Sequence, residues 1–536
     1  MVLVVLLVAV GVLVPMMCWG IPSGGDLANH YRFAQPFYES IRSGHFYPGW
    51  LAESNYGFGD ARFRFYPPGL YYLMALFRLV SGWYAASLLA FITLSMLGGG
   101  GAYFWARQSH STTVAMWAGV LYSIAPYHLN QIYQASLLSE YAACSVLPFL
   151  FAFVERVCRR RSAADVAGLG VTYALLVLTH LPLTVIGSLS IAVYALLLLR
   201  RERLWSNVLR LTTGVVIGLT ASAFFWTTVI AEMKWIKGNS ANQNGYYNYR
   251  NNFLFSSAAL TNRNTWYANL LAFAVVGMAL PALLLIRKKW RVSNTKAVAG
   301  VTGLSFLMAT DLSRPLWLMI PKLSDVQFPW RWLTITSLGA SILVAASVPK
   351  WKEVWRKEFR PVHLVPIGAF VLSLFFVATQ VVIDCEYLPR QQFEPMLSSI
   401  RNSASFPDWL PAAATQEVTE FGSSALVAAG SRAISVKTWE PEHREFKVGA
   451  GTSTAATVRT YFYPLWKATV NDRPVTPSVG KNGAMMVELP GDEARIKLDF
   501  VEPMRVKVVR IASLFGWLTI ASLFGFGLRF RTRTTA

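Results

Sequence analysis

The residues best suited to chemistry lie in a polar stretch that follows the apolar N-terminal segment and extends to residue 67. Asp26 follows two glycines, and His30 comes four residues later. A carboxylate just outside a bilayer can act as a general base toward a hydroxyl group, or help to hold a metal ion. Residues four apart share one face of a helix, so the two side chains would act together. The alternative is that Asp26 is only the N-cap of a helix over 27–43.

More charged residues follow in the same stretch. Arg32 comes soon after His30, and Glu53 and Asp60 bracket a loop rich in glycine and aromatic residues. Glu53 and Asp60 could bind sugar hydroxyls. Together with Asp26 they are also candidates for a divalent cation such as Mg²⁺ or Mn²⁺, which prefers oxygen ligands. Ordinary loop polarity is the alternative.

Three arginines are candidates for binding a lipid phosphate. Arg62 and Arg64 come directly after Asp60, and Arg331 lies between two tryptophans at the start of an apolar segment. The guanidinium group is a planar and permanently charged fork that suits phosphate oxygens. The alternatives are extension of Arg62 and Arg64 toward lipid headgroups and anchoring of Arg331 at the membrane interface.

Later loops contain further polar candidates. His128 belongs to a stretch rich in tyrosine, asparagine and glutamine, Glu140 opens an apolar segment, and His180 lies in a tight turn between two apolar segments. All three could contact a substrate. A carboxylate also complements the dipole of a helix start, and a turn histidine is often structural. The loop 234–263, rich in asparagine, tyrosine and glycine, suits sugar contacts or a mobile lid.

Several common catalytic signatures are absent from the sequence. It contains no Walker loop, no Gly-x-Ser-x-Gly elbow and no His-Glu-x-x-His motif. Its four cysteines, Cys18, Cys144, Cys158 and Cys385, suggest no disulfide pairing and show no metal-binding spacing such as Cys-x-x-Cys.

The elements that must position these residues are membrane helices. Of the 536 residues, 54% are hydrophobic and only 14% are charged, whereas about 25% is usual for soluble proteins. Apolar runs of about 20 residues can cross a bilayer. We therefore predict a mainly α, polytopic membrane protein with about twelve full spans, near 1–20, 83–105, 113–129, 138–157, 164–180, 181–199, 208–231, 266–287, 296–310, 331–348, 361–383 and 508–528.

The charge pattern predicts how these spans are oriented. The net charge is +21, but the basic residues occur in short runs between apolar segments, at 156–161, 200–210, 287–291, 350–360 and 529–533. This is the pattern of cytoplasmic loops and not of nucleic-acid binding. It places both termini in the cytoplasm and the loop 21–67 outside. The short segment 68–80 follows two prolines, so we expect a partial or re-entrant helix on the outer side.

The segment 384–507 has a different pattern. Polar and apolar residues alternate, with turn-forming pairs such as Asn471-Asp472 between the runs. This alternation predicts antiparallel strands and a small extracytoplasmic β-sandwich. The chain then divides into a membrane domain (1–383), the β-rich domain (384–507), and a final helix with a basic tail (508–536). The β-rich domain could bind an acceptor or cover the membrane cavity.

Several motifs resemble a known bacterial family. The order of residues over Gly24–Arg32, Trp50–Gly59 and Phe65–Leu73 resembles multi-pass proteins called 6-pyruvoyl-tetrahydropterin synthase-related. Phe328–Arg331 and Tyr463–Asn471 resemble related membrane proteins of cell-envelope glycosylation. The architecture is similar to that of the GT-C glycosyltransferase superfamily.

The resemblance implies an enzyme of the bacterial inner membrane that takes a sugar from a polyprenyl-phosphate carrier. The acceptor would be an envelope glycan, lipid or protein on the outer face. Asp26 would be the catalytic base or a metal-associated acid. Two alternatives remain: a non-catalytic transporter or flippase of a lipid-linked glycan, and an envelope scaffold. A transporter would carry charges in the middle of its spans, whereas the ionisable residues here gather near the segment ends.

Overall fold

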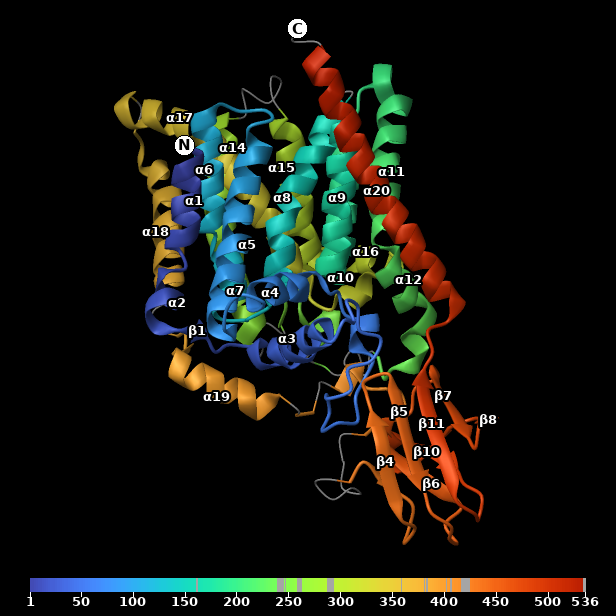
Figure 1. The fold of residues 1–536 in the computed structure, drawn as a ribbon. Helices are drawn as coiled ribbons and strands as arrows, with labels where there is room; N and C mark the ends of the chain where they lie inside the picture. Colours follow the sequence, from blue (N-terminus) through green and yellow to red (C-terminus); the bar gives the residue numbers. More distant parts are fainter. Residues whose placement is uncertain are drawn as a thin grey trace.

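A computed structural model describes residues 1–533 except 161, 239–244, 246, 258–262, 287–293, 358, 380, 382–383, 402, 405–406 and 416–424. Its main body is a bundle of helices that run roughly side by side, and the β-strands form a unit beyond one end of the bundle (Figure 1). The N-terminus and the end of the last helix lie at the opposite end (Figure 1). We call these the β end and the terminal end.

The helices account for most of the chain. Those of the bundle are α1 (Val2–Gly11), α2 (Val14–Trp19), α5 (Trp83–Ala106), α6 (Thr112–Ser123), α7 (Pro126–Tyr133), α8 (Leu138–Arg159), α9 (Ala163–Thr179), α10 (Leu181–Leu198), α11 (Leu204–Ala221), α12 (Ala223–Glu232), α14 (Arg263–Ile286), α15 (Thr295–Ala309), α17 (Leu333–Lys357), α18 (Leu364–Ala378) and α20 (Met504–Arg533). Shorter helices are α3 (Leu27–Arg42), α4 (Gly69–Arg78), α16 (Arg314–Met319) and α19 (Arg390–Ile400).

The number of spans differs from the prediction. Among the described residues, seven helices are long and apolar enough to cross a membrane, or eight if α11 and α12, which meet at 71°, form one broken span. The predicted twelve full spans are not confirmed. Proline at the start of α2 and of α7 interrupts two predicted segments, and α1, α6, α9 and α15 have 10, 12, 17 and 15 residues. At 1.5 Å per residue, such helices are about 15 to 26 Å long.

The helix α4 agrees with the prediction of an incomplete crossing at 68–80. It has 10 residues, or about 15 Å of helix. It lies at the β end together with α3 and α19 (Figure 1). Leu70 and Met74 of α4 pack in one buried core with Phe33 and Phe37 of α3, so the two helices form a shared layer across this end of the bundle.

The predicted strands form two antiparallel sheets, which we call the β unit (residues 425–500). Buried side chains of both sheets, including Phe446, Val448, Val458 and Met485, belong to one core. The strand order is β3 (Val427–Ala428), β6 (Ala455–Tyr461), β10 (Ala484–Glu488), β9 (Ser478–Val479) in one sheet, and β4 (Ile434–Trp439), β5 (His443–Val448), β11 (Ala494–Phe500), β7 (Trp466–Val470), β8 (Arg473–Val475) in the other.

The first loop packs into the β unit although more than 350 residues separate them in sequence. Trp50, Phe58 and Phe65 are buried in the same core as the strands. The backbone N–H of Tyr461 donates to the carbonyl of Phe58 over 2.8 Å. In a separate two-stranded sheet, β1 (Ile21–Pro22) pairs antiparallel with β2 (Tyr387–Leu388), which precedes the β unit in the sequence. Residues 21–65 therefore connect the bundle to the β unit.

Two predicted features cannot be compared with the structure. Much of the loop 234–263 and the whole basic run 287–291 lie outside the described residues.

Candidate active site

Two glycines set the position of Asp26. Gly25 has φ +43°, and a Cβ atom placed on it would lie 1.8 Å from the carbonyl oxygen of Ala135. A Cβ atom on Gly24 would lie 2.1 Å from the carbonyl oxygen of Gln134. Because glycine lacks a side chain, the chain can approach this backbone closely. The N–H of Asp26 then donates to the carbonyl of Ala135 over 3.1 Å.

The side chain of Asp26 does not cap the helix that it precedes. Asp26 occupies the N-cap position of α3, but its carboxylate accepts no bond from the first backbone N–H groups of the helix. It receives one long bond, 3.4 Å, from the side-chain amide of Asn29. Burial raises the pKa of Asp26, while Asn29 and the nearby charge of Arg331 oppose the shift. A partly exposed carboxylate with a raised pKa is suited to accept a proton.

His30 has a structural position beside Asp26. Its Nε2 accepts the N–H of Leu138 over 3.2 Å, so the ring proton is on Nδ1, which donates to the Tyr71 hydroxyl over 2.9 Å. The side chain is buried, and burial lowers its pKa to about 3. His30 is therefore neutral at physiological pH and ties α3 to α4 and to the start of α8.

Arg331 and Glu140 form a buried ion pair beside this group. Arg331 Nε donates to Glu140 Oε2 over 2.9 Å, and Arg331 Nη1 donates to the carbonyl of Val326 over 2.6 Å. The hydroxyl of Tyr127 donates to Glu140 Oε1 over 3.0 Å. Glu140 thus does more than open α8, because it orients the guanidinium whose charge acts on Asp26.

His180 lies near the same group but has a partner of its own. Its Nδ1 accepts the N–H of Leu183 over 3.3 Å, which caps α10. The charge of Arg331 acts on it. The structure therefore brings Asp26, His30, Glu140, His180 and Arg331 together at the β end, where α3, α8 and α10 begin and residues 329–332 lead into α17.

Sequence reasoning missed three polar residues of this site. The hydroxyl of Tyr66 donates to Ser139 Oγ over 3.4 Å. Burial raises the pKa of Tyr66 to about 12, with Asp26 and Arg331 among the charges that act on it. Asn29 joins Asp26 to Arg32, whose Nη1 donates to the Asn29 side-chain oxygen over 2.9 Å. In the sequence, Asn29 lies three residues from both Asp26 and Arg32, and this helical spacing was the signal that could have identified it.

Three predicted site residues, Asp60, Arg62 and Arg64, have other partners. Asp60 and Arg62 are fully buried and bonded to each other, with 2.8 Å between Arg62 Nε and Asp60 Oδ1. Asn55 donates to the other Asp60 oxygen over 2.6 Å. Arg64 donates to Glu232 and Glu502 and is also buried. Burial alone would lower the pKa of Arg64, but these carboxylates raise it. The expectation that both arginines bind a lipid phosphate is corrected here, because their guanidinium groups are already occupied.

The remaining predicted residues contact other side chains. Glu53 is exposed, 3.5 Å from Arg401. The ring of His128 stacks between Tyr122 and Tyr141, with centroid distances of 4.9 and 4.5 Å.

The predicted metal site is not assembled. Asp26, Glu53 and Asp60 have separate partners, and both oxygens of Asp60 accept hydrogen bonds. Among the described residues no group of three or more His, Cys, Asp or Glu side chains is placed to hold a metal ion. These three carboxylates therefore do not fit a shared cation.

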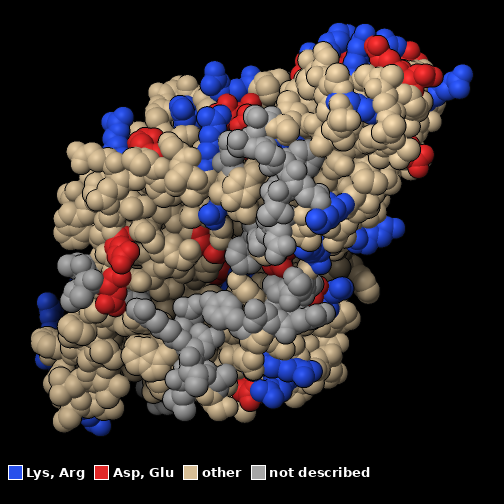
Figure 2. Space-filling view, turned by 90° about the horizontal axis from the view of Figure 1, so that it is seen from below, with Lys and Arg blue, Asp and Glu red and all other residues tan. Residues whose placement is uncertain are grey.

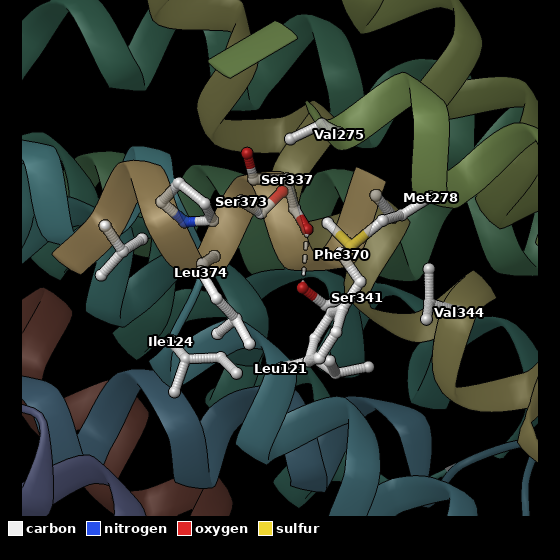
Figure 3. Close-up of a pocket in the computed structure, with 14 residues that line it drawn as sticks. Leu121, Ile124, Val275, Met278, Ser337, Ser341, Val344, Phe370, Ser373 and Leu374 are labelled. Atoms are coloured by element: carbon white, nitrogen blue, oxygen red, sulfur yellow. Dashed lines mark hydrogen bonds between the residues drawn. The ribbon is translucent and has the colours of Figure 1, made fainter. Parts of the chain in front are cut away.

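An apolar cavity lies along α17, beyond the turn that carries Arg331. It lies between α6, α14, α17 and α18 and is partly open to the surroundings. Leu121, Met278, Phe370 and Leu374 line it, and Ser341 faces it while donating to the carbonyl of Ser337 over 2.8 Å (Figure 3). The hydroxyl of Ser341 is thereby satisfied, and the cavity presents mainly hydrocarbon.

The chain is similar to several solved structures. The arabinofuranosyltransferase AftD from Mycobacteria is 14% identical, and the match covers 73% of this chain and 28% of that one, with a TM-score of 0.45. ArnT from Cupriavidus metallidurans is 15% identical over 74% of this chain and 73% of that one, with a TM-score of 0.44. The Archaeoglobus fulgidus oligosaccharyltransferase is 15% identical over 74% and 54%, with a TM-score of 0.42. This chain thus spans less than a third of AftD.

Sequence comparisons identify the family. No curated protein matches the chain. Residues 63–388 match the family model described as "6-pyruvoyl-tetrahydropterin synthase related domain; membrane protein". The match covers more than half of the chain, and it includes Glu140, His180 and Arg331 but not Asp26. The chain therefore belongs to this family of membrane proteins.

Proposed function

We propose that this membrane protein is a GT-C-like glycosyltransferase. It would transfer a sugar from a polyprenyl-phosphate carrier to a hydroxyl group of an envelope glycan, lipid or protein. The observation that carries this proposal is the carboxylate of Asp26, which lies at a helix N-cap without capping it. The charge of the buried Arg331 acts on this carboxylate. A base that can accept a proton, under the influence of a positive charge, suits transfer of a sugar away from a phosphate group.

The proposed step uses each of these groups. The acceptor hydroxyl gives its proton to the Asp26 carboxylate, and its oxygen bonds to the anomeric carbon of the sugar. The bond from that carbon to the phosphate oxygen breaks, and its electron pair leaves with the phosphate. Arg331, held by Glu140 and the Val326 carbonyl, would stabilise the negative charge that develops there.

The remaining features are consistent with a lipid-borne donor. The apolar cavity along α17 begins one to two helical turns beyond Arg331 and could take part of a hydrocarbon tail. The basic runs favour a cytoplasmic terminal end. The β end, with Asp26, would then face the outer side of a bacterial inner membrane.

Replacement of Asp26 tests the proposal. Asp26→Asn keeps the shape but removes the base, so we expect sugar transfer in membrane vesicles to fall by about 10² to 10⁴-fold. Glu53→Gln is the matched control, because Glu53 is exposed and has one long ion pair. The assay uses radiolabelled polyprenyl-phosphate sugars, with protein amount measured in parallel. Full transfer by Asp26→Asn would exclude this role and favour the flippase or scaffold alternative.

A further inference from the structure

Arg444 in β5 is a buried arginine with few hydrogen-bond partners. Its side chain is fully buried. Nη1 donates to the carbonyl of Arg459 over 3.1 Å, but Nε and Nη2 make no hydrogen bond to any residue that the structure describes. Two N–H edges of a buried cation are therefore left without an acceptor, which is a costly arrangement.

A second buried arginine of the β unit shows the contrast. Arg432 donates to four backbone carbonyls at 2.6 to 2.8 Å, those of Gly449, Ser453, Pro490 and Asp492. The buried arginines of the first loop and of the candidate active site pair instead with carboxylates. Arg444 has neither a set of carbonyl acceptors nor a carboxylate partner. Its unpaired N–H groups are therefore not a general property of the buried arginines that the structure describes.

Aromatic rings surround the guanidinium of Arg444. Its central carbon lies 4.3 Å from the ring centroid of Trp439 and 5.1 Å from that of Trp466. Such rings attract a cation through their faces but do not replace the strong acceptors that its N–H groups require. Burial without a counter-charge lowers the pKa of Arg444 to about 9, which agrees with the missing acceptors.

One of the two rings belongs to an edge strand. Trp439 lies on β4, an edge strand, directly opposite Arg444 in the strand pairing, and it is partly exposed. The site also lies near the first loop, because Glu442 accepts the N–H of Gly49 over 3.3 Å. Figure 2 shows basic and acidic side chains together on the projecting part of the molecule that forms the β unit.

We propose that Arg444 is the centre of an oxyanion-binding site in the β unit, which takes a carboxylate or phosphate group carried by a sugar. The free Nε and Nη2 edge is the part of a guanidinium that binds such groups as a fork. Trp439 offers a ring on which a sugar can stack. The site lies outside residues 63–388 and does not depend on Asp26 or on the transfer reaction.

Binding to the purified full-length protein tests the site. The probes are glucuronate, inorganic phosphate and, as a neutral control, glucose, at constant ionic strength. We expect glucuronate or phosphate to bind saturably and to raise the unfolding temperature, and glucose to have no effect. Binding of one anion alone identifies the group as carboxylate or phosphate, and either result supports the site. No response to either anion overturns the proposal.

Variants distinguish a specific site from a general effect of salt. Arg444→Met should abolish the rise in unfolding temperature that the anion causes. Arg432→Met should unfold at a lower temperature but still respond to the anion. If Arg444→Met does not fold, Arg444→Lys serves instead, because it keeps the charge, loses the fork and should weaken binding at least tenfold. An unchanged response in either Arg444 variant overturns the proposal. Asp26→Asn should bind the anion normally, so failure of the transfer mechanism remains a separate result.

Discussion

Arg64 and Glu232 join the first loop to the membrane bundle through a buried, two-pronged ion pair. Nε and Nη2 of Arg64 donate to the two oxygens of Glu232 over 2.6 and 2.7 Å. Tyr463 of the β unit and Arg505 at the start of α20 donate to the same carboxylate, over 2.8 and 2.5 Å. One carboxylate at the end of α12 therefore holds three distant segments, and Arg64 lies two residues before Tyr66 of the candidate site.

Loss of the Glu232 charge should destabilise the whole protein. Glu232→Gln leaves Arg64 buried without its full partner, and breaking a buried pair typically costs about 3–5 kcal/mol. Denaturant unfolding of the purified protein measures the change. Glu53→Gln, at an exposed position, should change stability by less than about 0.5 kcal/mol. Equal stability of the two variants would show that the network does not hold the segments together.

The β-rich segment should not fold without the first loop. Trp50, Phe58 and Phe65 complete its core, so residues 384–507 expressed alone would expose that surface. We expect no cooperative unfolding transition for this fragment by circular dichroism, and recovery of the transition when residues 45–66 are fused to it. In the full chain, Trp50→Ala should cost about 3–5 kcal/mol. Cooperative unfolding of the fragment alone would contradict this.

Gly25 should be intolerant of any side chain. Gly25→Ala places a Cβ atom against the Ala135 carbonyl and requires a positive φ, so the turn must move and Asp26 with it. We expect at least a hundredfold loss of the proposed transfer activity. Gly44→Ala is the matched control, since Gly44 has φ +91° but open space around its Cβ position. That variant should cost about 1–2 kcal/mol of strain and keep activity. Similar losses of activity in Gly25→Ala and Gly44→Ala would mean that backbone strain, and not the clash with the Ala135 carbonyl, causes the loss.

His30 should make stability fall in acid. Its folded pKa, about 3, is below the ordinary value of about 6.5, so the unfolded chain binds the proton more readily. The stabilising contribution is complete above pH 6.5 and decreases as the pH falls toward 3. Between pH 6.5 and 5 this amounts to about 2 kcal/mol.

A His30→Gln variant isolates this effect. Its amide oxygen can still accept the Leu138 N–H, but the group does not titrate. We expect the difference in unfolding free energy between pH 7 and pH 5 to be smaller in the variant, as measured by denaturant unfolding at both values. Identical pH dependence in the two proteins would contradict a buried neutral His30.

The sequence by itself determined the class of each region. Hydrophobic composition predicted membrane helices, period-two alternation predicted the antiparallel strands, and the short proline-led segment predicted a helix too short to cross. Asp26, His30, Glu140, His180 and Arg331 were predicted as site residues from residue type and position at the ends of apolar segments, and the structure places them in one region. These signals are local, because each depends on a few consecutive residues.

Only the tertiary structure decided which charges are free and which are paired. Arg62, Arg64 and Arg331 look alike in the sequence, yet Arg62 pairs with Asp60, Arg64 with Glu232, and Arg331 with Glu140 next to Asp26. Two of these partners lie 168 and 191 residues away. The electrostatics of a buried group depend on what lies within a few ångströms in space, and one sequence does not record such distances. The entry of Trp50 into the β core and the isolation of Arg444 were hidden for the same reason.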